Sequence, residues 1–203
     1  SSQVQAVDLG LPSGIKWANM NVGATKPEEY GDYFAWGETS PKEVYNWSTY
    51  KWCNGSYDTQ TKYCIHSDYG YNGFTDGKTT LDPEDDAAHV NWGGSWRMPT
   101  KAEQDELRNT DNCTWEWKTN YNGTNVNGYL VTSKKNGNSI FLPASGYRYD
   151  SSVGNVGSYG DYWSSSLDEG GSNYAYNLYV DSDYVDWSNS SRLYGLSVRP
   201  VCQ

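Results

Sequence analysis

Asp161-Tyr162-Trp163-Ser164-Ser165-Ser166 opens the closing segment of the chain, Tyr176-Asn177-Leu178-Tyr179-Val180 lies in its middle, and Gly195-Leu196-Ser197-Val198-Arg199-Pro200 ends it. In the middle run every second residue differs in kind, as in a strand with one dry and one wet face. The alternation resumes after Ser182-Asp183, so we predict a curved antiparallel surface over residues 161–200. The residues predicted to point inward are Tyr176, Leu178, Val180, Val185 and Trp187, and those predicted to point outward are Asn177, Tyr179, Asp181, Tyr184, Asp186 and Ser188.

The outward positions of this surface hold the residue types that recognition surfaces favour. Tyr supplies a large contact area at a low entropic cost, while Ser, Asn and Gly adapt their hydrogen bonds. We therefore expect the segment 161–200 to bind a ligand.

A bias in amino-acid usage suggests how this segment was shaped. No lysine follows Lys135, and between residues 161 and 196 there is no Gln or Met and a single Glu, Glu169. The outward residue types (Asn, Asp, Ser, Tyr and Leu) are all reached from an Asn codon by changing only its adenines, whereas Lys, Glu, Gln, Met and Trp are not. This pattern fits adenine-directed diversification. The alternative is an ordinary Tyr-, Ser- and Asn-rich β surface.

The composition predicts a folded, loop-rich, single domain covering residues 1–203. Hydrophobic residues make up only 36 %, but there are 10 Trp and 19 Tyr, and each buried aromatic removes ~150–250 Å² from water. The formal net charge is -10, and Lys and Arg form no patch. We therefore expect no nucleic-acid partner and no direct membrane insertion. Because the chain starts Ser1-Ser2-Gln3, we expect a signal peptide or lipid-anchor region upstream.

One pair of cysteines and one acidic segment each have both a structural and a functional interpretation. Cys53 and Cys64 flank a polar loop and could close it as a disulfide; metal ligation is the rival, but no Cys-x-x-Cys pair exists. Residues 82–89 (DPEDDAAH) predict a helix with Asp82 as cap and Pro83 at its first position. Its carboxylates could serve catalysis or calcium, although capping and a buried partner such as Arg97 are favoured.

Other elements follow from local signals. Residues 100–103 (TKAE) form a capping box, which predicts a helix ending near Asn109. Residues 128–133 and 139–143 predict a hairpin turned by Asn136-Gly137. Residues 7–18 predict two short strands, and residues 39–80 a long surface loop pinned by aromatic side chains.

Several motifs together resemble a known family. They are residues 8–14 (DLGLPSG), 33–38 (YFAWGE), 81–88 (LDPEDDAA), 96–100 (WRMPT), 141–148 (FLPASGYR), 162–166 (YWSSS) and 197–200 (SVRP). This set resembles the major paralogous domain family of Bacteroidetes and Fibrobacter. The resemblance implies an α+β, C-type lectin-like fold, related to the formylglycine-generating enzyme, with two short helices, antiparallel strands and long irregular loops.

Some members of that family are variable proteins of diversity-generating retroelements in gut bacteria and their phages. The resemblance implies that residues 161–200 are the variable ligand-binding segment. Tyr162, Trp163, Leu178, Trp187, Gly195 and Arg199 would be framework. The ligand-binding residues would be Asp168, Tyr174, Asn177, Tyr179, Asp181, Asp183, Tyr184, Asp186, Ser188, Ser190, Ser191, Leu193, Tyr194 and Leu196.

No motif predicts catalysis, a cofactor or a metal. The chain lacks the motifs of calcium-dependent sugar sites in C-type lectins, and Asp181, Asp183 and Asp186 lack calcium-loop spacing. His66 and His89 have no nucleophile motif beside them. Cys202 is the only cysteine near the C-terminal end, whereas the formylglycine-generating enzyme works through cysteines there.

The leading hypothesis is a non-enzymatic, receptor- or adhesin-type binding module for a protein or glycan on another cell surface. The alternatives are a metal-independent carbohydrate-binding lectin domain and a structural module of a cell-surface or fimbrial assembly. We expect the protein to be secreted, anchored at the bacterial surface like an outer-membrane lipoprotein, or part of a phage virion.

Overall fold

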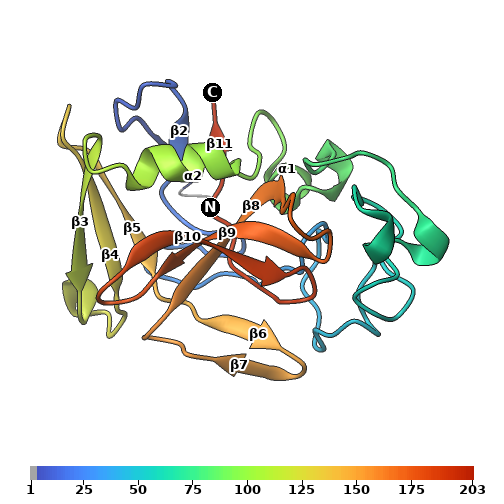
Figure 1. The fold of residues 1–203 in the computed structure, drawn as a ribbon. Helices are drawn as coiled ribbons and strands as arrows, with labels where there is room; N and C mark the ends of the chain where they lie inside the picture. The colour runs from blue at the N-terminus through green and yellow to red at the C-terminus, as the bar shows by residue number, and fades with distance from the viewer. Residues whose placement is uncertain (1–3) are drawn as a thin grey trace.

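The structure is a computed structural model that describes residues 4–203, and it has an α+β architecture of small antiparallel sheets and few helices (Figure 1). The strands are β1 (Ala6–Val7), β2 (Lys16–Ala18), β3 (Cys113–Lys118), β4 (Gly128–Ser133), β5 (Ser139–Pro143), β6 (Tyr147–Tyr149), β7 (Ser152–Gly154), β8 (Gly160–Leu167), β9 (Tyr174–Val180), β10 (Val185–Ser191) and β11 (Val201–Cys202). The helices are α1 (Ala87–Trp92) and α2 (Lys101–Arg108), with 3₁₀ turns η1 (Ser67–Tyr69), η2 (Tyr71–Gly73), η3 (Pro83–Asp85) and η4 (Tyr121–Gly123).

Each sheet is antiparallel and has two or three strands. The strand orders are β1-β2-β11, β10-β9-β8, β3-β4-β5 and the hairpin β6-β7. Strand β11 pairs with β2, which brings the end of the chain beside its beginning. In Figure 1 the hairpin β6-β7 lies on the far side of the β8–β10 sheet from this small terminal sheet.

Local sequence signals explain most of these elements. The capping box of α2 is confirmed: the Thr100 hydroxyl accepts the Glu103 N–H, and the Glu103 carboxylate accepts the Thr100 N–H. The hairpin β4-β5 is confirmed, and Gly137 supplies the positive φ (77°) that its turn needs. Asp82 occupies the N-cap position and Pro83 the first position of a helical turn, as predicted, but the prediction of one continuous helix over residues 82–89 is wrong. Residues 83–85 form only a 3₁₀ turn, and Asp86 caps α1 by accepting the N–H of His89.

The β8–β10 sheet has core on both faces. On one face Tyr162 and Leu178 pack in a cluster that also contains Leu107 of α2. On the other face Trp163 packs in a second cluster with residues that include Leu196. A sheet buried on both faces at its centre leaves only its edge strand and its ends for contact with a ligand.

Buried polar side chains bind mainly to backbone carbonyls. The indole Nε1 of Trp163 donates to the Phe34 carbonyl over 2.7 Å, and the indole Nε1 of Trp36 donates to the Ser164 carbonyl over 2.8 Å. The fully buried Arg199 donates to the Phe141 carbonyl and to other groups of the framework. Because a carbonyl is part of every residue, these bonds depend on backbone position and not on the acceptor's side chain.

The segment 39–80 is the long loop that the sequence predicts, with only the 3₁₀ turns η1 and η2 and isolated bridges. Tyr45, Tyr50 and Tyr63 are buried and fix it to the core. The predicted Cys53–Cys64 disulfide is absent, since each cysteine is a free thiol. Cys53 instead points at the Trp47 carbonyl and Cys64 at the His66 carbonyl.

Candidate functional site

The register of the β8–β10 sheet places its side chains in rows. Asp161, Tyr179 and Asp186 are directly opposite one another across the three strands, and Tyr162 and Leu178 are opposite one another in the next row. In antiparallel strands, residues that face each other project from the same side of the sheet, and the next row projects from the other side. The alternation predicted from the sequence is therefore confirmed: Leu178 and Val180 belong to the buried side, and Tyr179 and Asp186 to the opposite side.

Most of the predicted ligand-binding residues do reach the surface. Tyr184, at the β9–β10 turn, is 67 % exposed. The others that are exposed or partly exposed are Tyr174, Tyr179, Asp181, Asp183, Asp186, Ser188, Ser190, Ser191 and Tyr194. They lie on β9, β10, the turn between them and the segment that follows β10.

Four predicted ligand-binding residues are buried, so their expected exposure is wrong. Asn177 is only 1 % exposed, and its side chain is bonded within the sheet to Asp161 of β8 and Ser190 of β10. Leu196 lies in the segment after β10, pairs with Phe34 and joins the core, and Leu193 is buried in the same segment. Asp168 closes a tight turn, where its carboxylate accepts the N–H of Gly170.

Trp187 was predicted to point inward, and this prediction is wrong. It is 46 % exposed although it belongs to the predicted inward row, because β10 is the edge strand of its sheet. Its ring meets Tyr176 edge to face, and the Lys101 ammonium lies 5.0 Å from its centroid. Tyr176 is itself half-buried. Both rings therefore add aromatic surface beside α2, at the outer edge of the sheet.

Asp181 organises the turn between β9 and β10. Its Oδ1 accepts the N–H groups of Asp183 and Tyr184, each over 2.8 Å, and its Oδ2 accepts the Tyr179 hydroxyl over 2.6 Å. The Tyr179 hydrogen bond is the main cause that lowers the pKa of Asp181. The turn is thus held from inside while Tyr184 projects from it.

A pocket opens between the β8–β10 sheet and the hairpin β6-β7. It has a volume of about 240 Å³, and four of its lining residues are tyrosines: Tyr147, Tyr159, Tyr179 and Tyr194. We call it the tyrosine pocket. Tyr147 meets Tyr194 edge to face with centroids 5.7 Å apart, and Tyr159 lies 5.5 Å from Tyr179. Tyr179 and Tyr194 are among the predicted ligand-binding residues, whereas Tyr147 and Tyr159 precede the predicted segment and were not among them.

The inner wall of the tyrosine pocket contains a nearly buried carboxyl group. Asp161 is 8 % exposed, and its Oδ1 accepts the Asn177 amide over 3.0 Å. Asn177 in turn accepts the Ser190 hydroxyl over 3.0 Å. Burial raises the pKa of Asp161 to about 7, against the opposing effect of the Asn177 hydrogen bond. No Lys or Arg among residues 4–203 forms an ion pair with this group.

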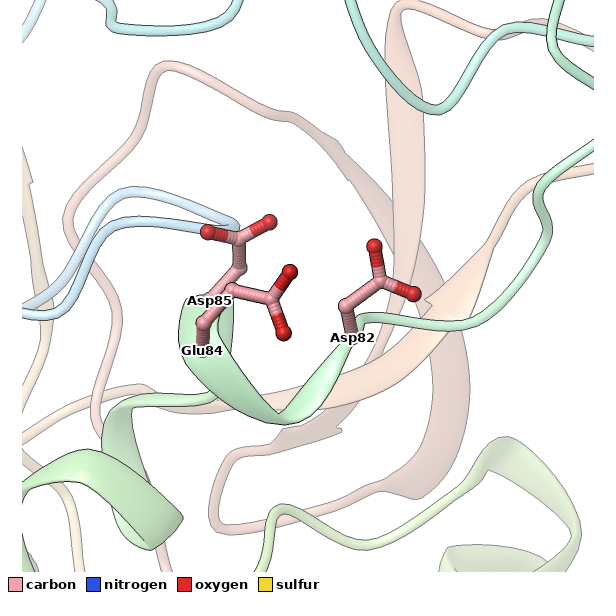
Figure 2. A group of neighbouring side chains, drawn as sticks. All are labelled: Asp82, Glu84 and Asp85. Atoms are coloured by element: carbon pink, nitrogen blue, oxygen red, sulfur yellow. The ribbon is translucent and has the colours of Figure 1, made fainter.

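A second group of carboxylates lies at η3, far from this pocket along the chain. Figure 2 shows Asp82, Glu84 and Asp85 converging. The expected partner Arg97 is wrong: it pairs with Glu103, whereas the Lys62 ammonium lies 3.1, 3.8 and 2.7 Å from the three carboxylates in that order. The Lys62 ammonium therefore already supplies a positive charge to these three carboxylates.

Comparison with known protein families gives a match over part of the chain only. A domain of unknown function (DUF8237) is similar to residues 116–201, which include strands β4 to β10 and the whole lining of the tyrosine pocket. No curated protein and no solved structure matches the chain. Within residues 4–203, no helix is long and apolar enough to span a bilayer.

Proposed function

We propose that this chain is a non-enzymatic ligand-binding module with a C-type lectin-like fold, and that the segment 161–200 displays its recognition residues. The observation that carries the proposal is the separation of roles within this segment. Tyr162, Trp163 and Arg199 are buried and bound to carbonyls elsewhere in the fold, while Asp183, Tyr184 and Asp186 are exposed to solvent. Residues of the second kind can change without loss of the scaffold.

The proposal includes diversification of the projecting residues by a retroelement. The bias in amino-acid usage within the segment supports it, and so does the exposure of most of the predicted variable positions. The buried Asn177, Leu193 and Leu196 then belong with the framework. The neighbouring DNA tests this: we expect a near-repeat of the codons for residues 161–200, differing only at adenines, beside a reverse transcriptase gene. Its absence would leave an undiversified binding module.

The partner we propose is a protein or glycan on another cell surface, met by a secreted, surface-anchored or virion-borne form of this module. A panned pool of displayed random peptides tests the binding face without knowledge of the natural ligand. We expect the triple variant Tyr179→Ala, Tyr184→Ala, Tyr194→Ala to lose binding, because each exposed aromatic anchor contributes ~1–2 kcal/mol or more.

The matched control is Tyr57→Ala, which removes a tyrosine that is 50 % exposed in the segment 39–80, outside the proposed face. Selected peptides should bind this variant as they bind the unmodified protein. Peptides that bind the triple variant equally well would place the site elsewhere on the molecule.

A metal-independent carbohydrate site is the second candidate. The tyrosine pocket favours it, because aromatic rings and the polar side chains of Asp161, Asn177 and Ser190 lie close together there. A glycan array read with and without EDTA separates the two functions: binding that survives EDTA and requires the pocket tyrosines would support a lectin.

A further inference from the structure

The tyrosine pocket has an unusual electrostatic composition. Its walls include four tyrosine rings, and Asp161 contributes a carboxyl group that no protein cation neutralises among residues 4–203. The negative faces of aromatic rings attract cations, and a carboxylate in the same site adds a full opposite charge. A neutral or anionic group would gain much less electrostatic attraction from the rings and the carboxylate than a cation would.

The hydrogen-bond pattern at the inner wall leaves acceptors for a donor group. Oδ1 of Asp161 is bound by Asn177, whereas Oδ2 has no donor among the residues that the structure describes. Ser190 donates its proton to Asn177, so its oxygen keeps acceptor capacity toward the pocket that it lines. A primary ammonium carries three donors and no acceptor, and it therefore fits these free positions. A quaternary ammonium has no donor to offer them.

The surface next to the pocket is acidic as well. A second hollow of about 420 Å³ shares Tyr159 with the tyrosine pocket, and its lining includes Asp181 and Asp183. A polypeptide with a second basic residue would meet these carboxylates. The formal net charge of -10 also favours the approach of a cationic ligand.

We infer that the tyrosine pocket binds the ammonium group of a lysine side chain on a partner polypeptide, with Asp161 as its counter-ion. The inference rests on the proposed ligand-binding function and specifies the chemistry of one part of that face. A volume of about 240 Å³ compares with ~30 Å³ for a water molecule in the liquid, so it accommodates an ammonium with its methylene stem.

The affinity depends on pH in a direction that the site determines. The other titratable side chains that line the pocket are the four tyrosines Tyr147, Tyr159, Tyr179 and Tyr194. Burial raises the pKa of Tyr179 and of Tyr194. Because the pKa of Asp161 is raised to about 7, the empty pocket is largely protonated below that pH. A bound ammonium stabilises the carboxylate, so affinity rises with pH across neutrality and binding below pH 7 releases a proton.

The first test titrates the full chain with n-butylammonium, the analogue of a lysine side chain, and follows the tyrosine ring resonances by NMR. We expect saturable shifts of the pocket tyrosines at pH 8, weaker shifts at pH 6, and at least about tenfold weaker binding by Asp161→Asn. Asp111→Asn is the matched control, since it removes the same charge from an exposed loop position and should bind as the unmodified protein does. Equal binding of n-butanol, equal or tighter binding of tetramethylammonium, or an unchanged Asp161→Asn variant would overturn the inference.

The second test separates this inference from the proposed function. Peptides selected on the chain are acetylated on their lysines and assayed again with Asp161→Asn. Loss of binding in both cases supports the inference. Peptides that still require Tyr179, Tyr184 and Tyr194 but tolerate acetylation and Asp161→Asn would refute the lysine pocket while the binding module stands. Butylammonium binding without any face-dependent peptide would refute the binding module instead.

Discussion

Replacement of Arg192 by methionine tests how the long loop of residues 39–80 is held to the segment 161–200. The fully buried guanidinium donates to the carbonyls of Lys62, Tyr63 and Ser172 over 2.8–2.9 Å and to the Tyr50 hydroxyl over 3.0 Å. Each carbonyl left without a donor costs about 1–3 kcal/mol, which gives roughly 3–9 kcal/mol for three. Removal of a buried charge returns several kcal/mol. We therefore expect Arg192→Met to lower the free energy of unfolding by about 3 kcal/mol.

Urea denaturation followed by tryptophan fluorescence measures this loss, and calorimetry should show a Tm lower by roughly 6–12 °C, at about 2–4 °C per kcal/mol for a chain of this size. Arg108→Met is the control, because Arg108 forms a partly exposed ion pair with Asp105 and should cost at most about 1 kcal/mol. If the two variants lost the same small stability, the carbonyl network around Arg192 would not hold the loop.

Three further variants follow from the structure. Asp161→Asn should stabilise the protein at pH 8 by up to about 4 kcal/mol, since the pKa of Asp161 is raised from 3.8 to about 7. The cost of burying the ionised carboxylate grows between about pH 4 and 7, so urea denaturation at pH 4 should show no gain in stability. A variant less stable than the unmodified protein at pH 8 would contradict this prediction. Thr100→Ala should cost about 1 kcal/mol in the same assay through loss of the α2 cap, whereas the exposed Thr114→Ala should not; equal losses would refute the cap's contribution. Gly146→Ala should be much more destabilising than Gly137→Ala in thermal melts. Both positions have a positive φ, which costs an alanine about 1–2 kcal/mol, but an added Cβ at Gly146 would lie 2.0 Å from a carbonyl oxygen, whereas at Gly137 it would meet nothing within 4 Å. Similar Tm values for the two variants would contradict this steric explanation.

The predictable part of this fold is local. Capping of α2 by Thr100 and the turn at Gly137 involve residues a few positions apart, and both predictions are confirmed. The alternation of β9 and β10 was also correct, because the pleat of a strand fixes which side chains share a side.

The wrong predictions concern features that depend on contacts between distant segments of the chain. Asn177 has the alternation of an outward residue, but it is buried at the centre of the sheet, where it bonds to Asp161 and Ser190 of the neighbouring strands. Trp187 has the size of a core residue, yet its strand is an edge. Tyr147 lies on β6 and Tyr159 directly before β8, both outside the predicted segment, and no periodicity within residues 161–200 could have indicated them.

The buried hydrogen bonds to backbone carbonyls affect how freely the sequence can evolve. Trp163 binds the main chain of Phe34, and Arg192 binds the main chain of Lys62, Tyr63 and Ser172. A mutation at an acceptor position replaces the side chain but keeps the oxygen, so these interactions do not require coordinated substitutions.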